Sequence, residues 1–154
     1  MSEQMRTVEV PQDAADTLYR RMAELIITEL YRPSENADII IQARVERTGP
    51  FTAYALLDDQ GELHGTITLA YNDTDQTAQI TELIVPEIER GLGRGKALLN
   101  GTALQMQQRN VQHVIVAPDN PARGFYIRVG FNKVKGKKYL AATPEEILAR
   151  TSTS

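Results

Sequence analysis

The chain has 154 residues, of which 42% are hydrophobic and 24% are charged. This length and balance predict one globular domain over residues 1–154, with about 1–6 and 151–154 frayed, rather than a disordered chain. A formal net charge of −3 argues against non-specific nucleic-acid binding, which needs a basic face. The chain has no cysteine, which excludes disulfides, thiolate metal sites and a cysteine nucleophile.

No apolar run approaches the roughly 20 residues of a membrane span, and the polar start of the chain does not resemble a signal peptide. A cytoplasmic protein is therefore expected. The two histidines, His64 and His113, are too few and too isolated for a zinc cluster. Both are expected in strands, without a catalytic role.

The first half of the chain predicts one amphipathic helix and several strands. The expected elements are a strand at 7–10, a helix from 13 to about 32, and strands at 51–57, 63–71 and 77–85. Residues 58–61 (Asp-Asp-Gln-Gly) indicate a hairpin turn, so the last three strands should form an antiparallel meander. Segment 35–47 is open between two interpretations. Apolar residues at every second position (Ile39, Ile41, Ala43 and Val45) favour a strand, whereas Ser34 followed by Glu35 is a helix-start signal.

The second half predicts a strand–helix–strand unit, which should be parallel and right-handed at this size. Its expected elements are a helix from about 93 to 109, a strand at 111–117, a short helix from Asp119 or Asn120 to Gly130, one or two strands within 131–142, and a terminal helix from Thr143. Asn110 is expected to end the long helix, and Pro121 to lie in the first turn of the short one.

A glycine-rich loop lies between the strand at 77–85 and the long helix. It carries three glycines at alternate positions, Gly91, Gly93 and Gly95, and three cations, Arg90, Arg94 and Lys96. Glycines let a backbone approach a ligand closely, and a helix start offers N–H groups and a positive dipole end. The loop therefore predicts a site for phosphate or another anion, most specifically a diphosphate.

Two common phosphate-binding motifs do not fit this loop. A mononucleotide P-loop needs Ser or Thr after Gly-Lys, but Lys96 is followed by Ala97, and position 90 is arginine where the motif needs glycine. A dinucleotide fingerprint begins at Gly91-Leu92-Gly93, but its third glycine is out of register. The preceding strand also follows an antiparallel meander instead of opening a βαβ unit.

The loop resembles the acyl-coenzyme A motif of the GCN5-related N-acetyltransferases, Gln/Arg-x-x-Gly-x-Gly/Ala, in the stretch Arg90–Gly95. The lead-in strand 82–87 (Glu-Leu-Ile-Val-Pro-Glu) is similar to the strand that precedes this motif in the family. A second block, 120–131 (Asn-Pro-Ala-Arg-Gly-Phe-Tyr-Ile-Arg-Val-Gly-Phe), resembles the family's N-x-x-A-x-x-F-Y-x-x-x-G-F pattern, with one residue fewer between Asn120 and Ala122, so that Asp119 is a second candidate for the asparagine position. The resemblance covers about 13–139.

This resemblance implies an α/β GNAT fold, a mixed and mostly antiparallel sheet flanked by helices, and it favours a helix at 35–47. It also implies acetyl-CoA as the acyl donor, with no metal. The implied cofactor-binding residues are Ile84, Val85, Arg90, Gly91, Leu92, Gly93, Arg94, Gly95, Lys96, Asn120 and Tyr126. Tyr126 matches the family's tyrosine that protonates the departing CoA thiolate, and Glu82 is the implied base, expected on one strand face with Ile80 and Ile84.

The implied function is direct acetyl transfer from acetyl-CoA to a primary amine of a small molecule or a protein. Polyamines, aminoglycosides, amino acids and protein amines are all open as acceptors, and a homodimer is open as the assembly. The alternative is an inactive CoA-binding sensor, which the presence of both Glu82 and Tyr126 disfavours. Action on charged tRNA would need a basic face, and the only candidate, the lysines of 133–138, is more simply a solvated strand edge.

Overall fold

The computed structural model describes residues 4–11, 13, 15–31 and 51–152. Segment 35–47, predicted as either strand or helix, lies outside the described residues. The elements, in chain order, are β1 (Arg6–Val10), α1 (Thr17–Tyr31), β2 (Phe51–Leu57), β3 (Leu63–Asn72), β4 (Thr77–Ile84), the 3₁₀ turn η1 (Glu87–Glu89), α3 (Arg94–Gln108), β5 (His113–Val116), α4 (Asn120–Arg128), β6 (Asn132–Lys133), β7 (Leu140–Ala142) and α5 (Pro144–Thr151). The type and order of the predicted elements are confirmed over these residues.

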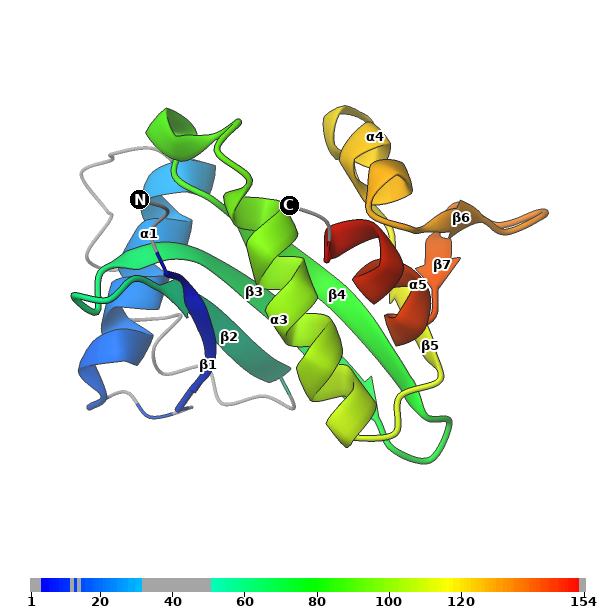
Figure 1. Cartoon of the computed structure of the whole chain (residues 1–154), viewed down its shortest axis with the longest axis horizontal. Coiled ribbons are helices and arrows are strands. Elements are labelled where there is room, and N and C mark those ends of the chain that lie inside the picture. Colours follow the sequence, from blue (N-terminus) through cyan, green and yellow to red (C-terminus); the bar gives the residue numbers. More distant parts are fainter. Residues whose placement is uncertain (1–3, 12, 14, 32–50, 153–154) are drawn as a thin grey trace.

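The strands form one mixed sheet in the order β1-β2-β3-β4-β5-β7-β6 (Figure 1). The strands β1 to β4 pair antiparallel in succession, which confirms the predicted meander. The β4–β5 pair is parallel, as predicted for a strand–helix–strand unit, and the last strands pair antiparallel. The β4–β5 pair, the only parallel one among the described strands, lies at the middle of the sheet, where the succession of antiparallel strands β1 to β4 ends.

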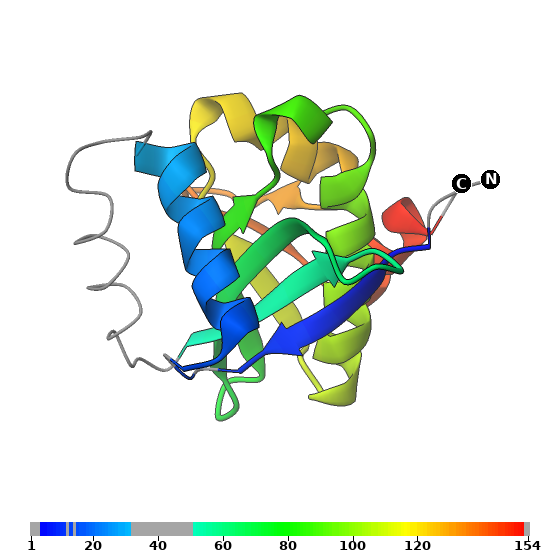
Figure 2. The ribbon, with the colours of Figure 1, turned by 90° about the vertical axis from the view of Figure 1, so that its left-hand side faces the viewer.

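Helices cover both faces of this sheet (Figure 2). One face packs against α1 through a smaller apolar cluster that includes Met22, Ile26 and Ile84. The opposite face packs against α3, α4 and α5 through a larger cluster that includes Leu98, Met106 and Phe131. The apolar residues of α1 and α3 recur at helical spacing, which is why each helix buries one stripe and leaves the other side to water.

The β4 and β5 strands separate towards their carboxyl ends. Their last paired residues are Ile80 and Val116, where β5 ends, whereas β4 continues to Ile84 while still paired with β3. The edge of β4 that faces β5 therefore has no strand partner over residues 81–84 among the described residues. A backbone edge of this kind can accept an extended ligand by main-chain hydrogen bonds.

The terminal helix α5 begins with a capping box and extends to Thr151. Thr143 Oγ1 accepts the Glu146 N–H at 3.1 Å, and Glu146 Oε1 accepts the Thr143 N–H at 2.9 Å. Thr151 is buried, and its hydroxyl donates to the Ile147 carbonyl at 2.7 Å.

None of the helices in the described part is long and apolar enough to cross a membrane.

The capping box gives a first test of the fold. Replacing Thr143 with alanine is expected to lower the free energy of unfolding by about 1 kcal/mol, the usual contribution of an N-cap hydroxyl. Urea denaturation measures this change. Thr74→Ala, in the exposed β3–β4 turn, is the matched control and is expected to change the free energy by less than about 0.5 kcal/mol. Equal losses of unfolding free energy in the two variants would contradict the capping role of Thr143.

Candidate active site

The glycine loop joins η1 to α3 and has the backbone shape that its sequence predicts. Gly91 and Gly93 have φ values of +91° and +80°, a region that other residues rarely adopt. Gly93 caps α3, and the first intrahelical bond is donated by Ala97 N–H to the Gly93 carbonyl at 3.0 Å. The amides of the first turn of a helix precede this bond, and they form the positive end of the helix dipole.

Gly95 has a different role, which is to let α4 approach α3. A Cβ at this position would lie 3.1 Å from Cζ of Phe125 and 3.8 Å from Cδ2 of Leu83. A side chain here would therefore displace the Phe125 ring. Gly95 thus sets the width of the space between the loop, the end of β4 and the start of α4.

That space is a cleft of about 920 Å³, a size typical of small-molecule and cofactor sites. Its lining comes from the end of β4, the glycine loop and α4, with single residues from α1 and α5. The lining residues are Glu29, Leu83, Ile84, Val85, Glu89, Arg90, Gly91, Gly93, Arg94, Gly95, Lys96, Asp119, Pro121, Ala122, Phe125, Tyr126, Arg128, Val129 and Arg150.

The arginines of the loop are paired with carboxylates that the sequence pattern did not indicate. Arg94 Nε donates to Glu89 Oε1 at 3.1 Å, and both side chains are largely buried, with 16% and 18% exposed. Arg90 is more exposed and lies 3.5 Å from Glu29 Oε1, which also accepts the Glu87 N–H at 2.6 Å. These carboxylates hold the two guanidinium groups beside the cleft.

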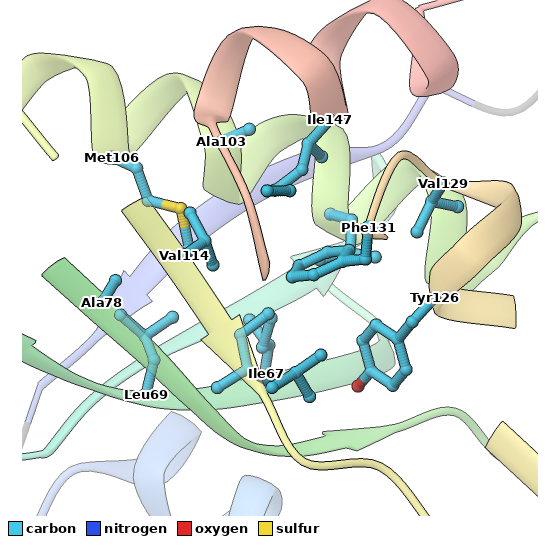
Figure 3. Close-up of a cluster of buried hydrophobic side chains, with 14 of the residues drawn as sticks. Ile67, Leu69, Ala78, Ala103, Met106, Val114, Tyr126, Val129, Phe131 and Ile147 are labelled. Carbon is cyan, nitrogen blue, oxygen red and sulfur yellow. The ribbon is translucent and has the colours of Figure 1, made fainter. Parts of the chain in front are cut away.

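Tyr126 extends from α4 into the wall of the same cleft. Its side chain is buried, and its ring makes edge contacts with Phe125 and Phe131 at centroid separations of 5.3 and 5.4 Å. Figure 3 shows Tyr126 beside Phe131 in a cluster of buried side chains. Among the described residues its hydroxyl has no hydrogen-bond partner. Burial raises the pKa of Tyr126 to about 12, so the phenol carries its proton throughout the physiological range.

Glu82 does not share a face with Ile80, and that part of its prediction is wrong. The β3–β4 register shifts between Thr68 and Leu69: Leu69 pairs with Ile80, whereas Thr68 pairs with Glu82. The resulting β-bulge at Thr81 reverses the alternation. Ile80 packs in the cluster under α3 and Ile84 in the cluster under α1, so Glu82 shares the α1 face with Ile84 only.

Two buried hydroxyls lie on this same face of β3. Thr66 pairs with Ile84 and Thr68 with Glu82. Neither threonine hydroxyl has a hydrogen-bond partner among the described residues. Directly opposed residues of an antiparallel pair have Cβ atoms about 5 Å apart, so the Thr68 hydroxyl is a polar neighbour of the Glu82 carboxylate that the sequence did not single out.

Most of the predicted site residues meet in the cleft. Ile84, Val85 and Tyr126 line it, as do Arg90, Gly91, Gly93, Arg94, Gly95 and Lys96. Leu92 is exposed and lies outside the lining, and Glu82, which is half-buried, also lies outside it. Asn120 begins α4 with Asp119 as its N-cap. The Asn120 side chain lies outside the described part, and its binding role remains a prediction.

Sequence analysis missed two cations of the lining, Arg128 and Arg150. Arg128 is the last residue of α4, five residues before Lys133, and Arg150 lies in α5, beyond the motifs that pointed to the loop. The only sequence signal is that each lies in the last turn of its helix. This position is common for a cation of any role.

Comparison with known proteins identifies the family. The family model for the acetyltransferase (GNAT) family matches residues 8–131, and the chain therefore belongs to this family, a class of acyltransferases. A search of curated protein sequences found no match.

Solved structures show the same fold at low sequence identity. The chain is similar to the catalytic domain of the Tetrahymena GCN5 histone acetyltransferase in complex with coenzyme A, with 16% identity, coverage of 94% of this chain and 95% of that one, and a TM-score of 0.63. It is also similar to a GNAT-family acetyltransferase of Staphylococcus aureus Mu50 (14% identity, 92% and 99% covered, TM-score 0.65). A dodecameric spermidine N-acetyltransferase of Vibrio cholerae gives 17% identity, 96% and 98% coverage and a TM-score of 0.67.

Proposed function

We propose that the chain transfers an acetyl group from acetyl-CoA directly to a primary amine of a small molecule or a protein. The observation that carries the proposal is the position of the Tyr126 hydroxyl. It is a buried phenol without a partner among the described residues, and it lines the same cleft as the glycine loop and the free edge of β4. An acyl-CoA needs these three features along one cleft: the glycine loop for its diphosphate, the β4 edge for its extended arm and the Tyr126 hydroxyl for its thioester.

The donor binds along the cleft in this proposal. Its diphosphate lies on the first-turn amides of α3, with Arg94 and Lys96 beside it. Its pantetheine arm pairs with the β4 edge at Ile84 and Val85 as an added strand. The thioester then reaches Tyr126 near the point where β4 and β5 separate. A Tetrahymena neighbour of the same fold is described as a coenzyme A complex.

The chemistry needs no covalent enzyme intermediate. The neutral amine nitrogen attacks the thioester carbonyl carbon, a carbon–nitrogen bond forms, and the carbon–sulfur bond breaks. The Tyr126 hydroxyl donates its proton to the departing CoA sulfur, and the proton lost from the amine nitrogen restores the phenol through solvent. The pKa of about 12 keeps this hydroxyl protonated, and therefore able to donate, before each turnover.

Glu82 is the proposed proton acceptor on the amine side. It lies on the α1 face of β4, beyond the last residue that pairs with β5. Because it is outside the cleft lining, we propose that it acts through water, with the buried hydroxyls of Thr66 and Thr68 as neighbouring water ligands.

The partners of this proposal are acetyl-CoA and an amine, in the cytoplasm. A homodimer is included as the simplest assembly, and the Vibrio cholerae neighbour is described as dodecameric. The alternative function is a catalytically inactive CoA-binding sensor. It would retain the glycine loop and the cleft but would have no use for a proton donor at Tyr126.

The test is release of free CoA thiol from acetyl-CoA, measured with a polyamine, an aminoglycoside, an amino acid and a lysine-containing peptide as acceptors. Thiol release that depends on one of these amines, with an N-acetylated product seen by mass spectrometry, is the expected result. The matched control is the same acceptor with its amines fully methylated, which should release no thiol. Tight CoA binding without turnover on any acceptor would favour the sensor.

A further inference from the structure

A series of ion pairs between side chains connects the β2–β3 turn to the glycine loop. Asp58 Oδ2 contacts His64 Nε2 at 2.8 Å, and His64 Nδ1 contacts Glu89 Oε1 at 2.6 Å. The same oxygen of Glu89 accepts from Arg94 Nε at 3.1 Å. All four side chains are largely buried, with between 12% and 18% of their surface exposed.

The far end of this chain of contacts is fixed to the backbone. Asp58 Oδ1 accepts the N–H groups of Gln60 and Glu62, each at 2.9 Å. His64 is thereby held from both sides, by a carboxylate anchored in a tight turn and by a carboxylate of η1. The near end, Glu89 and Arg94, lines the cleft.

The geometry requires the imidazolium form of His64. A neutral imidazole has one N–H and one bare nitrogen, so it can donate to only one of two carboxylates. Both ring nitrogens of His64 lie within 2.8 Å of a carboxylate oxygen, and a bare nitrogen at that distance would repel the oxygen. Each ring nitrogen therefore carries a proton, and the ring carries a positive charge.

The surroundings of His64 shift its pKa in both directions. Burial of the ring opposes its charge, but hydrogen bonds to Asp58 and Glu89 outweigh burial and raise the pKa of His64 above its ordinary value of 6.5. Arg94, from the start of α3, lowers it. Arg21 of α1 reaches the same turn, at 3.3 Å from the Gly61 carbonyl and 3.6 Å from Glu62.

Glu89 presents a difficulty for an anion site, because its carboxylate lies in the wall where a diphosphate would bind. Two like charges at short range in a partly dry cleft repel strongly. The Arg94 guanidinium cannot neutralise Glu89 and the incoming diphosphate fully at the same time. A second cation, directed at Glu89 from behind the cleft wall, removes the conflict.

We propose that His64 is a positioning residue for the CoA diphosphate: as an imidazolium held between Asp58 and Glu89, it offsets the Glu89 charge and leaves Arg94 directed at the anion. This inference rests on the proposed CoA-binding function of the cleft. Because His64 must be charged, CoA affinity is highest below the raised pKa of His64 and falls as the pH rises through it.

The experiment is calorimetric titration of the full chain with CoA and, separately, with inorganic pyrophosphate, from pH about 5 to about 9. His64→Gln removes the charge. It should weaken CoA binding about tenfold at the acidic end, which is within the usual range of coupling between sites. It should also remove the part of the pH dependence that titration of His64 causes. At saturating acetyl-CoA its kcat should equal that of the wild type. His113→Gln, which changes the other histidine, is the matched control.

A second variant separates charge compensation from a structural role. Glu89→Gln keeps an oxygen that can accept from Arg94 but removes the charge that His64 offsets. It should bind CoA at least as tightly as the wild type without the pH dependence, and the double variant should recover most of the affinity lost in His64→Gln. A merely structural histidine would give neither this recovery nor a pH dependence that differs between the wild type and His64→Gln.

The two proposals can fail separately. If the wild type and His64→Gln bind CoA with the same affinity at every pH, the inference on His64 is overturned and the proposed function stands. Wild-type protein that binds neither CoA nor pyrophosphate at any pH overturns both.

Discussion

Replacing Tyr126 with phenylalanine is expected to lower kcat by about 100-fold to 10,000-fold, the usual contribution of a general acid. The affinity for CoA should change little, because the diphosphate loop and the β4 edge are untouched. The variant should also fold normally, since the hydroxyl makes no hydrogen bond within the described residues and the ring contacts with Phe125 and Phe131 remain. Steady-state thiol release gives kcat, and protection by CoA against thermal unfolding reports binding.

Tyr139→Phe is the control for this experiment. It deletes the same atom from a half-buried tyrosine that is not in the cleft lining, and we expect wild-type turnover. A Tyr126→Phe variant with full turnover would show that the departing sulfur takes its proton elsewhere. The acid role of Tyr126 would then be wrong even if the cleft binds CoA.

Replacing Gly130 with alanine is expected to lower the free energy of unfolding by about 3 kcal/mol, the largest stability effect that we predict. Gly130 follows α4 with φ +112°, a conformation that costs other residues about 1–3 kcal/mol. An added Cβ would also lie 2.7 Å from the Glu146 carbonyl oxygen in α5. Because that atom is backbone, the contact is relieved only if α4 and α5 move apart.

The control separates these two causes. Gly136 also has a positive φ, +76°, but nothing lies within 4 Å of a Cβ built there. Gly136→Ala should therefore show only the backbone cost, about 1 kcal/mol. Urea denaturation of both variants measures the difference. Equal losses would mean that α5 does not pack against the end of α4 as described.

The features that the sequence predicted correctly depend on local patterns. Glycines at alternate positions indicated the loop, and Gly91 and Gly93 indeed have positive φ. Asn110 ends α3 in the left-handed region, at φ +60°, as its side chain favours. Tyr126 was found because it lies in the block 120–131 that resembles a family motif, and residues 120–128 of that block form one helix on the cleft wall.

The features that the sequence did not predict depend on contacts between distant segments. Strict alternation placed Glu82 with Ile80, but the β-bulge at Thr81 arises only when β4 pairs with β3. His64 was expected to have no catalytic role, and nothing near it in sequence indicated Glu89, which is 25 residues away. The partner of Arg90, Glu29 in α1, is also distant in sequence, whereas the partner of Arg94, Glu89, lies only five residues away in η1.

The most direct test of the account is a single-turnover reaction, with enzyme in excess over acetyl-CoA and a productive amine, quenched at successive times. The account predicts that free CoA and the N-acetylated amine appear at the same rate, while the mass of the protein stays that of the unmodified chain throughout. An acetylated form of the protein that appears before the product, or bound acetyl-CoA that persists without any acetylated amine, would contradict direct transfer within this cleft.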